Sequence, residues 1–390
     1  MTTPNIGTRV VVLKPGGIKN VANAVQYQRI LTLSKNYSTA IVTDGLIPPR
    51  IASVSNRYHT VRRGWRFIPS AVRVVGSLWK DGFHVIYTSN QPRAIIVVFL
   101  ARLLNPFMWI ADIWDDPMLA FRDMRKGRMK TMLFRKFLKS VLPQADAWIL
   151  GLHEGILAEL PLRLNETHLL RVTNGVCLDL VVPDDIGDDV GRPLKGSLRV
   201  GYSGWVTLKR GIALLIACLE RDGAFTDRIE VHVWGPAEED AEVAINLHNR
   251  CFDQKIYYHG HVSHNESLRL LNSCDVGLCI LDQSVTNFRY AYPIKLFEYM
   301  ATGKVVIASD TPAIGEIIRN GQTGFLIRNT VESMCDCLEK TISLKSQNML
   351  SGIGNSARKQ AEQYDWNDIN QQVMDFLEGE LGFSPKYYQN

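Results

Sequence analysis

A lysine and a glutamate three positions apart, Lys295 and Glu298, give the clearest indication of a binding site in this sequence. Apolar residues recur around them at helical spacing, so both are expected on the polar face of one short helix, where they neighbour each other. A pair of cations, Lys209 and Arg210, stands directly before another predicted helix. Cations at the positive end of a helix stabilise negative charge, so these residues could hold an anionic group.

Turns and a short strand must position the first pair. Pro293 precedes the helix that carries it, and Gly303 ends that helix in the manner of a C-terminal glycine. The apolar run 305–308 is typical of a buried parallel strand, and a new helix is predicted to begin at Pro312. Loops therefore open at the carboxyl end of a parallel strand, where ligands bind in open α/β sheets.

A glycine pair marks a second candidate site in the first half of the chain. Residues 9–13 read as a buried strand, and Gly16 and Gly17 follow before a helix that runs to about residue 34. Backbone N–H groups in such a loop suit a phosphate or a sugar hydroxyl. A tight turn without a ligand explains the glycines equally well, and neither the G-x-G-x-x-G nor the G-x-x-x-x-G-K-[ST] fingerprint occurs.

Three carboxylates follow the predicted strand 107–111. We expect Asp112 to contact a substrate, and Asp115 is the first choice for acceptor binding or for general-base work. Asp116, directly before Pro117, could instead cap a helix.

Charge is divided unevenly along the chain. Residues 1–175 contain 24 Lys and Arg and 10 Asp and Glu, a net charge of +14, whereas residues 176–390 contain 20 and 29, a net charge of −9. A basic, aromatic segment at 56–67 and a basic amphipathic helix predicted at 121–142 lie in the first half. Each alone could be a solvated loop or a peripheral helix, but together they favour contact with an anionic membrane over nucleic-acid binding.

Length and composition indicate a globular protein of two domains. The longest apolar tract, 94–104, is too short to span a bilayer, and the N-terminus does not read as a signal peptide. The seven cysteines are odd in number and form no C-x-x-C pair, so we expect reduced thiols and a cytoplasmic protein. His259, His261 and His264 lack a fourth ligand of matching direction, and no metal site is expected.

Residues 293–310 read P-I-K-L-F-E-Y-M-A-T-G-K-V-V-I-A-S-D, and N-G-x-T-G-x-L follows at 320–326. This segment resembles the donor site of the retaining glycosyltransferases of family 4, of the bacterial cell-surface polysaccharide type, and weaker similarity extends over most of the chain. The resemblance implies the GT-B fold, an α/β architecture of two Rossmann-like parallel-sheet domains that face each other across a cleft. The alternation of strands and helices agrees with it.

The resemblance also implies domain limits. An acceptor-binding domain is expected at 1–175 and a nucleotide-sugar-binding domain at 176–365. A C-terminal helix at 366–390 is expected to cross back to the first domain.

Residue roles follow from the same resemblance. In that family the glutamate that matches Glu298 holds the ribose of the donor, and another glutamate eight positions earlier grips the donor sugar. Tyr290 occupies the earlier position here, which is a departure from the family.

The diphosphate-binding loop departs from the family as well. Gly204 matches, but Trp205 replaces a common arginine, so only one of two cations is retained, as Lys209 or Arg210. The other residues that we expect to contact the substrates are Gly16, Gly17, Gly235, Gly260, Val262, Pro293, Ile294 and Lys295.

The implied reaction is the retaining transfer of a sugar from a UDP- or GDP-sugar to a glycan or lipid-linked acceptor, in surface polysaccharide or glycoconjugate biosynthesis. No metal or other cofactor is expected, because Lys209 and Arg210 would stabilise the departing diphosphate. Retention would depend on a donor phosphate oxygen that takes the acceptor proton. The protein would act at the inner face of the cell membrane. A sugar-nucleotide epimerase of the same fold stays open, as does a non-enzymatic membrane or nucleic-acid binding protein. A nicotinamide dehydrogenase is disfavoured by the missing dinucleotide fingerprint.

Overall fold

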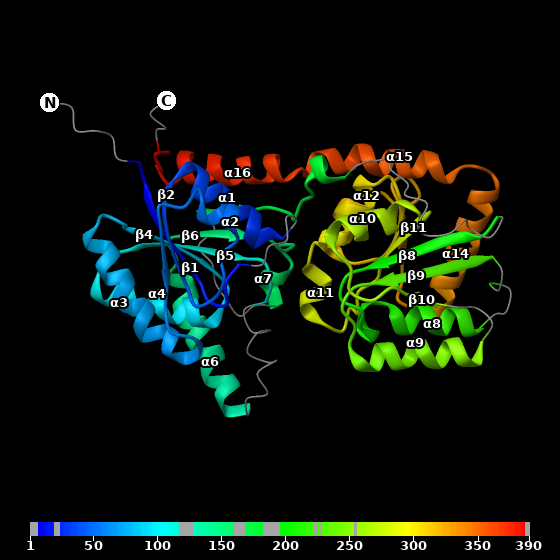
Figure 1. Cartoon of the computed structure of the whole chain (residues 1–390), viewed down its shortest axis with the longest axis horizontal. Helices are drawn as coiled ribbons and strands as arrows, with labels where there is room; N and C mark the ends of the chain where they lie inside the picture. The colour runs from blue at the N-terminus through cyan, green and yellow to red at the C-terminus, as the bar shows by residue number, and fades with distance from the viewer. Residues whose placement is uncertain are drawn as a thin grey trace. The chain divides into compact units, whose positions relative to one another are not determined.

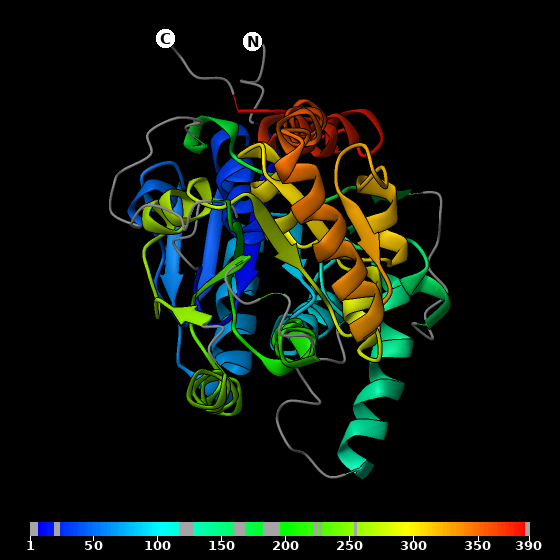
Figure 2. The same cartoon turned by 90° about the vertical axis from the view of Figure 1, so that its right-hand side faces the viewer.

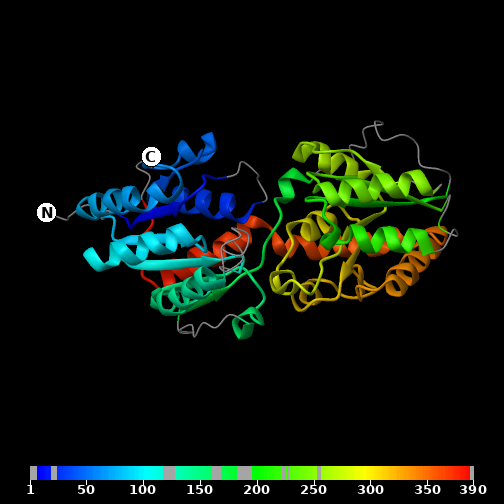
Figure 3. The same cartoon turned by 90° about the horizontal axis from the view of Figure 1, so that it is seen from below.

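The computed structural model describes residues 7–18, 24–116, 128–159, 168–181, 196–221, 225, 228–252 and 256–386. It divides the chain into two compact units (Figure 1). The first unit combines Met1–Thr173 with Trp366–Asn390, and the second is Asn174–Asp365. Each unit holds one all-parallel sheet with helices on both faces (Figures 1 and 3), which confirms the predicted fold class.

The first sheet has the strand order β3-β2-β1-β4-β5-β6-β7. Its strands are β1 (Arg9–Lys14), β2 (Ser38–Thr43), β3 (Arg57–Thr60), β4 (Val85–Ser89), β5 (Met108–Ile113), β6 (Ala147–Leu150) and β7 (Leu169–Arg171). The helices of this unit are α1 (Val25–Asn36), α2 (Pro49–Ala52), α3 (Phe67–Lys80), α4 (Pro92–Leu104), α6 (Arg128–Val141), α7 (Ile156–Glu159) and α16 (Trp366–Gly379), with 3-10 turns η1 (Gly64–Arg66) and η2 (Leu142–Gln144). Because the strand order reverses at β1 and β4, the loops after these strands meet at a topological switch point.

The second sheet has the strand order β10-β9-β8-β11-β12-β13. Its strands are β8 (Leu198–Ser203), β9 (Ile229–Trp234), β10 (Ile256–Tyr258), β11 (Val276–Cys279), β12 (Val305–Ser309) and β13 (Phe325–Ile327). Its helices are α8 (Ile212–Arg221), α9 (Glu239–Cys251), α10 (His264–Asn272), α11 (Thr286–Tyr290), α12 (Ile294–Ala301), α13 (Pro312–Ile317), α14 (Val331–Ser346) and α15 (Leu350–Ala361), with 3-10 turns η4 (Leu178–Leu180), η6 (Leu208–Arg210) and η8 (Glu362–Tyr364). Here β8 and β11 flank the switch point, so the site is expected at their carboxyl ends.

Apolar strands form the core of each unit. Val10, Val11 and Val12 of β1 are completely buried, as expected for a central parallel strand that is covered on both faces. In the second unit two separate apolar clusters cover the two faces of the sheet. A fully buried Val, Leu or Ile side chain contributes roughly 1.5–3 kcal/mol relative to its exposed state, so these strands give the loops a rigid base.

The C-terminal helix α16 packs within the first unit. Arg29 of α1 donates a hydrogen bond to the Asn370 side chain over 3.0 Å, and the Tyr37 ring meets Phe383 edge-on at 5.4 Å between centroids. Both contacts tie the end of the chain to its first helix.

Two features differ from the expectations. Residues 57–60 of the basic segment form the edge strand β3 beside β2, which polar side chains conceal in the sequence. Cys218 and Cys335 form a disulfide, with Cα atoms 5.8 Å apart, so the expectation of reduced thiols is wrong for this pair. The packing of α14 on α8 brings together two residues 117 positions apart, which sequence spacing does not reveal.

Among the described helices none has the length and apolar character needed to cross a bilayer.

Candidate functional site

Three glycines converge at the carboxyl edge of the second sheet. Gly204, Gly235 and Gly260 follow β8, β9 and β10, and all have positive φ angles, of 109°, 124° and 71°. The Gly235 N–H donates a hydrogen bond to the Gly260 carbonyl over 2.7 Å, and a Cβ atom at Gly235 would lie 2.0 Å from the Gly204 carbonyl oxygen. Only glycine fits at that position, and the backbone at this edge is open to a close ligand. The structure therefore brings together the three glycines that the sequence predicted to contact the donor.

Lys295 lies beside this glycine cluster. Helix α12 begins at Ile294, directly after Pro293, and points the Lys295 side chain into the protein, where only 8% of the residue is exposed. Its Nζ atom lies 3.6 Å from the centroid of the Tyr202 ring, and a Cβ atom at Gly204 would lie 3.8 Å from Nζ. Nζ has no hydrogen-bond partner among the described residues. Burial lowers the Lys295 pKa to about 7; the Cys279 thiol opposes this shift, the Arg210 charge adds to it, and the Glu298 charge opposes it.

Glu298 follows one helical turn later. Its side chain is 13% exposed, and its Oε1 lies 3.8 Å from Nδ1 of His264, the first residue of α10. Val262, two residues before His264, packs against the same apolar cluster as α12. The predicted neighbours Lys295 and Glu298 are thus close enough for the Glu298 charge to act on the Lys295 ammonium.

Of the two candidate cations, Arg210 is the one directed toward this group. Both residues belong to the 3-10 turn η6, which leads through Gly211 into α8. The Arg210 guanidinium lies over the Phe288 ring of α11, with 4.9 Å between its central carbon and the ring centroid. Lys209 is exposed, and its carbonyl accepts a hydrogen bond from the Asp282 N–H over 2.9 Å.

Tyr290 is the last residue of α11, and its half-buried ring lies 5.8 Å from the Arg289 guanidinium carbon.

Sequence reasoning did not identify Tyr202, Cys279 and Phe288 as part of this group. Tyr202 and Cys279 lie on apolar strands and read as core residues, so no local signal distinguishes them.

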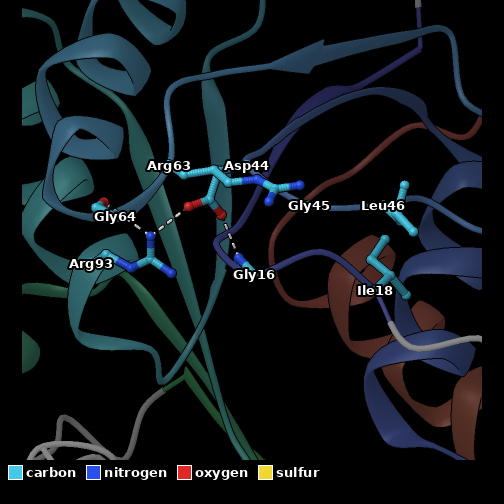
Figure 4. A pocket seen from close by; sticks show the side chains of 8 residues that line it. All are labelled: Gly16, Ile18, Asp44, Gly45, Leu46, Arg63, Gly64 and Arg93. Atoms are coloured by element: carbon cyan, nitrogen blue, oxygen red, sulfur yellow. Dashed lines mark hydrogen bonds and ion pairs between the residues drawn. The ribbon is translucent and has the colours of Figure 1, made fainter.

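A pocket of about 550 Å³ lies in the first unit, after β1 and β2 (Figure 4). Gly16 lines it, and the Gly16 N–H donates a hydrogen bond to Asp44 Oδ1 over 2.6 Å. Arg93 donates to Asp44 Oδ2 over 2.6 Å and to the Gly64 carbonyl over 3.0 Å. Burial alone would raise the Asp44 pKa, but the Gly16 hydrogen bond and the Arg93 hydrogen bond and charge lower it, so the carboxylate stays ionised.

Gly17 is part of the turn beside this pocket. It has a φ angle of 79°, and a Cβ atom there would lie 2.7 Å from the Leu46 backbone nitrogen and oxygen. Gly17 is therefore required by the close approach of the Leu46 backbone, whereas a Cβ atom at Gly16 would meet no atom within 4 Å and only its φ angle of 83° favours glycine.

The two carboxylates Asp112 and Asp115, at the end of β5, differ in exposure and in their contacts. Asp112 is 1% exposed, and its Oδ2 lies 3.2 Å from the Arg29 Nε and accepts a hydrogen bond from the Tyr87 hydroxyl. Burial raises the Asp112 pKa, while Arg29 and Tyr87 lower it. This carboxylate ties β5 to α1 inside the unit, which contradicts the predicted substrate contact. Asp115 is exposed, and its carbonyl accepts a hydrogen bond from the Asn90 side chain over 2.5 Å.

The three histidines do not converge. The His259 Nε2 lies 3.0 Å from the His232 Nδ1, and the two rings stack. Burial, the neighbouring His259 and the Arg199 charge lower the His232 pKa to about 4, although Glu230 opposes the shift. His261 is exposed and His264 faces Glu298, and within the described ranges no group of three His, Cys, Asp or Glu side chains is placed to hold a metal.

The basic segments of the first unit form part of its surface. Trp65 is 52% exposed between exposed arginines, while Phe67 turns inward at the start of α3. Helix α6 extends away from its sheet (Figures 1 and 2), with Met129, Met132 and Leu133 more than half exposed. Residues 121–127 of the predicted basic helix lie outside the described residues.

Comparisons with known proteins bear on the family and the fold. Residues 198–343 match the family model of the glycosyl transferases group 1. No curated protein sequence matches the chain.

Solved structures share the fold over almost the whole chain. Sucrose-phosphate synthase from Thermosynechococcus elongatus superposes with a TM-score of 0.74 at 15% identity, covering 96% of this chain and 99% of that one. Anabaena HepE, solved in complex with UDP and glucose, gives 0.73 at 14% identity, covering 95% and 100%. The lipopolysaccharide outer core galactosyltransferase WaaB gives 0.66 at 11% identity, covering 96% and 100%. The chain therefore carries a glycosyl transferases group 1 domain at residues 198–343, and it is a glycosyltransferase of the GT-B fold.

Proposed function

We propose that this glycosyltransferase moves a sugar from a UDP- or GDP-sugar to a glycan or lipid-linked acceptor, with retention of the anomeric configuration. The observation that carries the proposal is that Lys295 lies beside Gly204 of the glycine cluster, while the charges of Arg210 and Glu298 both act on it. Anabaena HepE, which was solved with UDP, has the same fold and supports a donor of this class.

Each donor contact has a chemical reason. The Glu298 carboxylate accepts hydrogen bonds from the ribose hydroxyls, and charge-assisted bonds of this kind are about twice as strong as neutral ones. Gly204, Gly235 and Gly260 allow the donor to approach the backbone, and the segment from Gly260 to Val262 lies against the base. Arg210 stabilises the negative charge that develops on the departing diphosphate, so no metal or other cofactor is needed.

Retention follows from where the acceptor proton goes. The bond between the anomeric carbon and the diphosphate oxygen breaks, and the acceptor oxygen bonds to the same face of the sugar. The acceptor proton passes to the departing diphosphate oxygen. The protein then has to orient the two substrates and stabilise the leaving group, which cations and backbone dipoles can do.

The first unit supplies the acceptor side of the proposal. Asp44 stays ionised in its pocket and can accept a hydrogen bond from a sugar hydroxyl, while the exposed Arg63 on the pocket rim suits an anionic group. Asp115 is exposed after β5 and is the candidate for positioning the acceptor hydroxyl.

We also propose peripheral contact with the anionic inner face of the cell membrane. The first turns of α6 expose Met129, Met132 and Leu133, and Lys136 and Lys139 are exposed farther along the same helix. Apolar side chains enter the headgroup region while lysines meet lipid phosphates, each adding roughly 1 kcal/mol. A membrane-bound acceptor fits a role in surface polysaccharide or glycoconjugate biosynthesis.

Release of UDP or GDP from the donor tests the proposal. Glu298→Ala and Arg210→Ala should each lower turnover by roughly 10- to 100-fold, because each removes a charge-assisted contact of about 1.5–3 kcal/mol. Arg221→Ala and Glu332→Ala are matched controls, because these residues form an exposed ion pair at the far end of α8. Turnover within twofold of the wild type in both site variants would remove these residues from the site.

A further inference from the structure

Lys295 presents a buried cation that the protein itself does not satisfy. The residue is 8% exposed, its Nζ has no hydrogen-bond partner among the described residues, and a buried ammonium without a partner is strongly unfavourable. Its Nζ lies over the face of the Tyr202 ring, 3.6 Å from the ring centroid. Such a cation–π contact contributes roughly 0.5–2 kcal/mol, which does not replace the water that the ammonium has lost.

The groups around Lys295 do not neutralise it either. Burial raises the pKa of the Cys279 thiol to about 11, although Lys295 and Arg210 lower it, so this thiol is uncharged near neutral pH. Burial also raises the Tyr202 pKa above its ordinary value, so the phenol is uncharged. Arg210 adds a second positive charge nearby, whereas the Cys279 thiol and the Glu298 carboxylate act on the Lys295 pKa in the opposite sense. Two cations and one carboxylate have a net positive charge, which a bound anion can balance.

The backbone leaves an opening next to the ammonium. Gly204 has no side chain, and a Cβ atom there would contact Lys295 Cε and Nζ at 3.7 and 3.8 Å. The Tyr202 hydroxyl donates a hydrogen bond to the Trp205 carbonyl over 2.7 Å, which fixes the ring that lies against Nζ. Trp205 itself is 52% exposed and brings no charge to this loop.

We propose that the Lys295 ammonium, together with Arg210, binds the diphosphate of a nucleotide at Gly204 and so replaces the cation that is absent at Trp205. The inference rests on the proposed function, which it makes more specific. Tyr202 is then a positioning residue that holds Lys295 toward the loop, and Gly204 is needed because any side chain would separate the ammonium from the phosphates.

A measurable consequence is that nucleotide binding takes up a proton. With a pKa of about 7, Lys295 is largely uncharged at pH 8 in the free protein, and a bound diphosphate returns its pKa toward the ordinary value near 10.5. Uptake should therefore be about 0.5 proton at pH 7 and about 0.9 at pH 8 and pH 9. A phosphate with a second pKa of about 6 is fully ionised at pH 8 and contributes nothing.

Titration calorimetry on the full chain tests this directly. UDP, GDP, ADP and dTDP are each titrated at pH 8 and 9 in two buffers of different ionisation enthalpy, and the difference in heat gives the number of protons taken up. We expect about 0.9 proton for the diphosphate that binds, and an affinity that falls about tenfold from pH 8 to pH 9. This part of the test needs no variant.

Lys295→Met removes the charge and keeps the shape, with Lys359→Met, an exposed lysine of α15, as the control. The site variant should lose the proton uptake and bind the diphosphate about 10- to 100-fold more weakly, with unchanged affinity for the matching monophosphate. Diphosphate binding to the wild type without proton uptake, or to Lys295→Met within twofold of the wild type, would overturn the inference and leave the proposed function intact. No binding of any of the four diphosphates to the wild type would overturn both.

Discussion

The unliganded protein should become more stable when Lys295 is replaced by methionine. The ordinary lysine pKa of 10.5 falls to about 7 in the folded state, mainly through burial. The unfolded chain therefore binds more protons than the folded one between these values, so the stability contribution of Lys295 is unfavourable below pH 7 and rises with pH toward 10.5. Integrating this proton difference over pH shows that the lowered Lys295 pKa reduces the free energy of unfolding by about 4 kcal/mol at pH 7. At pH 8.5 the reduction is about 1.6 kcal/mol smaller.

Urea unfolding of the wild type and of Lys295→Met at pH 7.0 and 8.5 measures this cost. The variant should be the more stable protein at both pH values, and its advantage should shrink by about 1.6 kcal/mol at the higher pH. The Cys279 thiol, whose pKa burial raises to about 11, stays protonated in both folded proteins over this pH range, so its contribution cancels in the difference. A variant less stable than the wild type at pH 7.0, or a difference that does not change with pH, would refute the reasoning that Lys295 is a buried, unpaired cation.

Three other predictions concern the two units separately. Asp112→Asn leaves the Arg29 guanidinium buried without its carboxylate, so it should destabilise the protein by about 3–5 kcal/mol in urea unfolding; a loss below 1 kcal/mol would contradict the buried-pair interpretation. Gly235→Ala places a methyl group 2.0 Å from the Gly204 carbonyl oxygen, so nucleotide affinity should fall at least tenfold in calorimetry; unchanged affinity would separate this loop from the donor site. Exchange of Met132 and Leu133 for serine should weaken sedimentation with anionic liposomes while leaving the melting temperature unchanged, because both side chains are exposed; equal sedimentation would remove α6 from the membrane contact.

Local signals in the sequence predicted much of the fold and the position of several residues of the candidate donor site. The buried strands are continuous apolar runs, and the glycines after β8, β9 and β10 stand where parallel strands end. Both features depend on a few neighbouring residues, so the sheets, the loops and the helix that carries Lys295 and Glu298 could be predicted without a structure.

Features that depend on packing between distant segments could not be predicted. Asp112 reads as a site carboxylate, because nothing in the sequence reveals that Arg29 lies 3.2 Å away. The contact of Tyr202 with Lys295 joins residues that are far apart in the chain, and so does the disulfide between Cys218 and Cys335. In each case the tertiary arrangement, and not the residue's own neighbours, determines its role.

A thermal-shift comparison of UDP-, GDP-, ADP- and dTDP-sugars with the wild type and with Glu298→Ala tests the central claim most directly. One sugar nucleotide at 100 times its dissociation constant should stabilise the wild type by about 2.7 kcal/mol, and the same concentration should stabilise Glu298→Ala far less. If no sugar nucleotide stabilises the wild type, or if Glu298→Ala responds as strongly as the wild type, the second domain does not bind its donor through the site described.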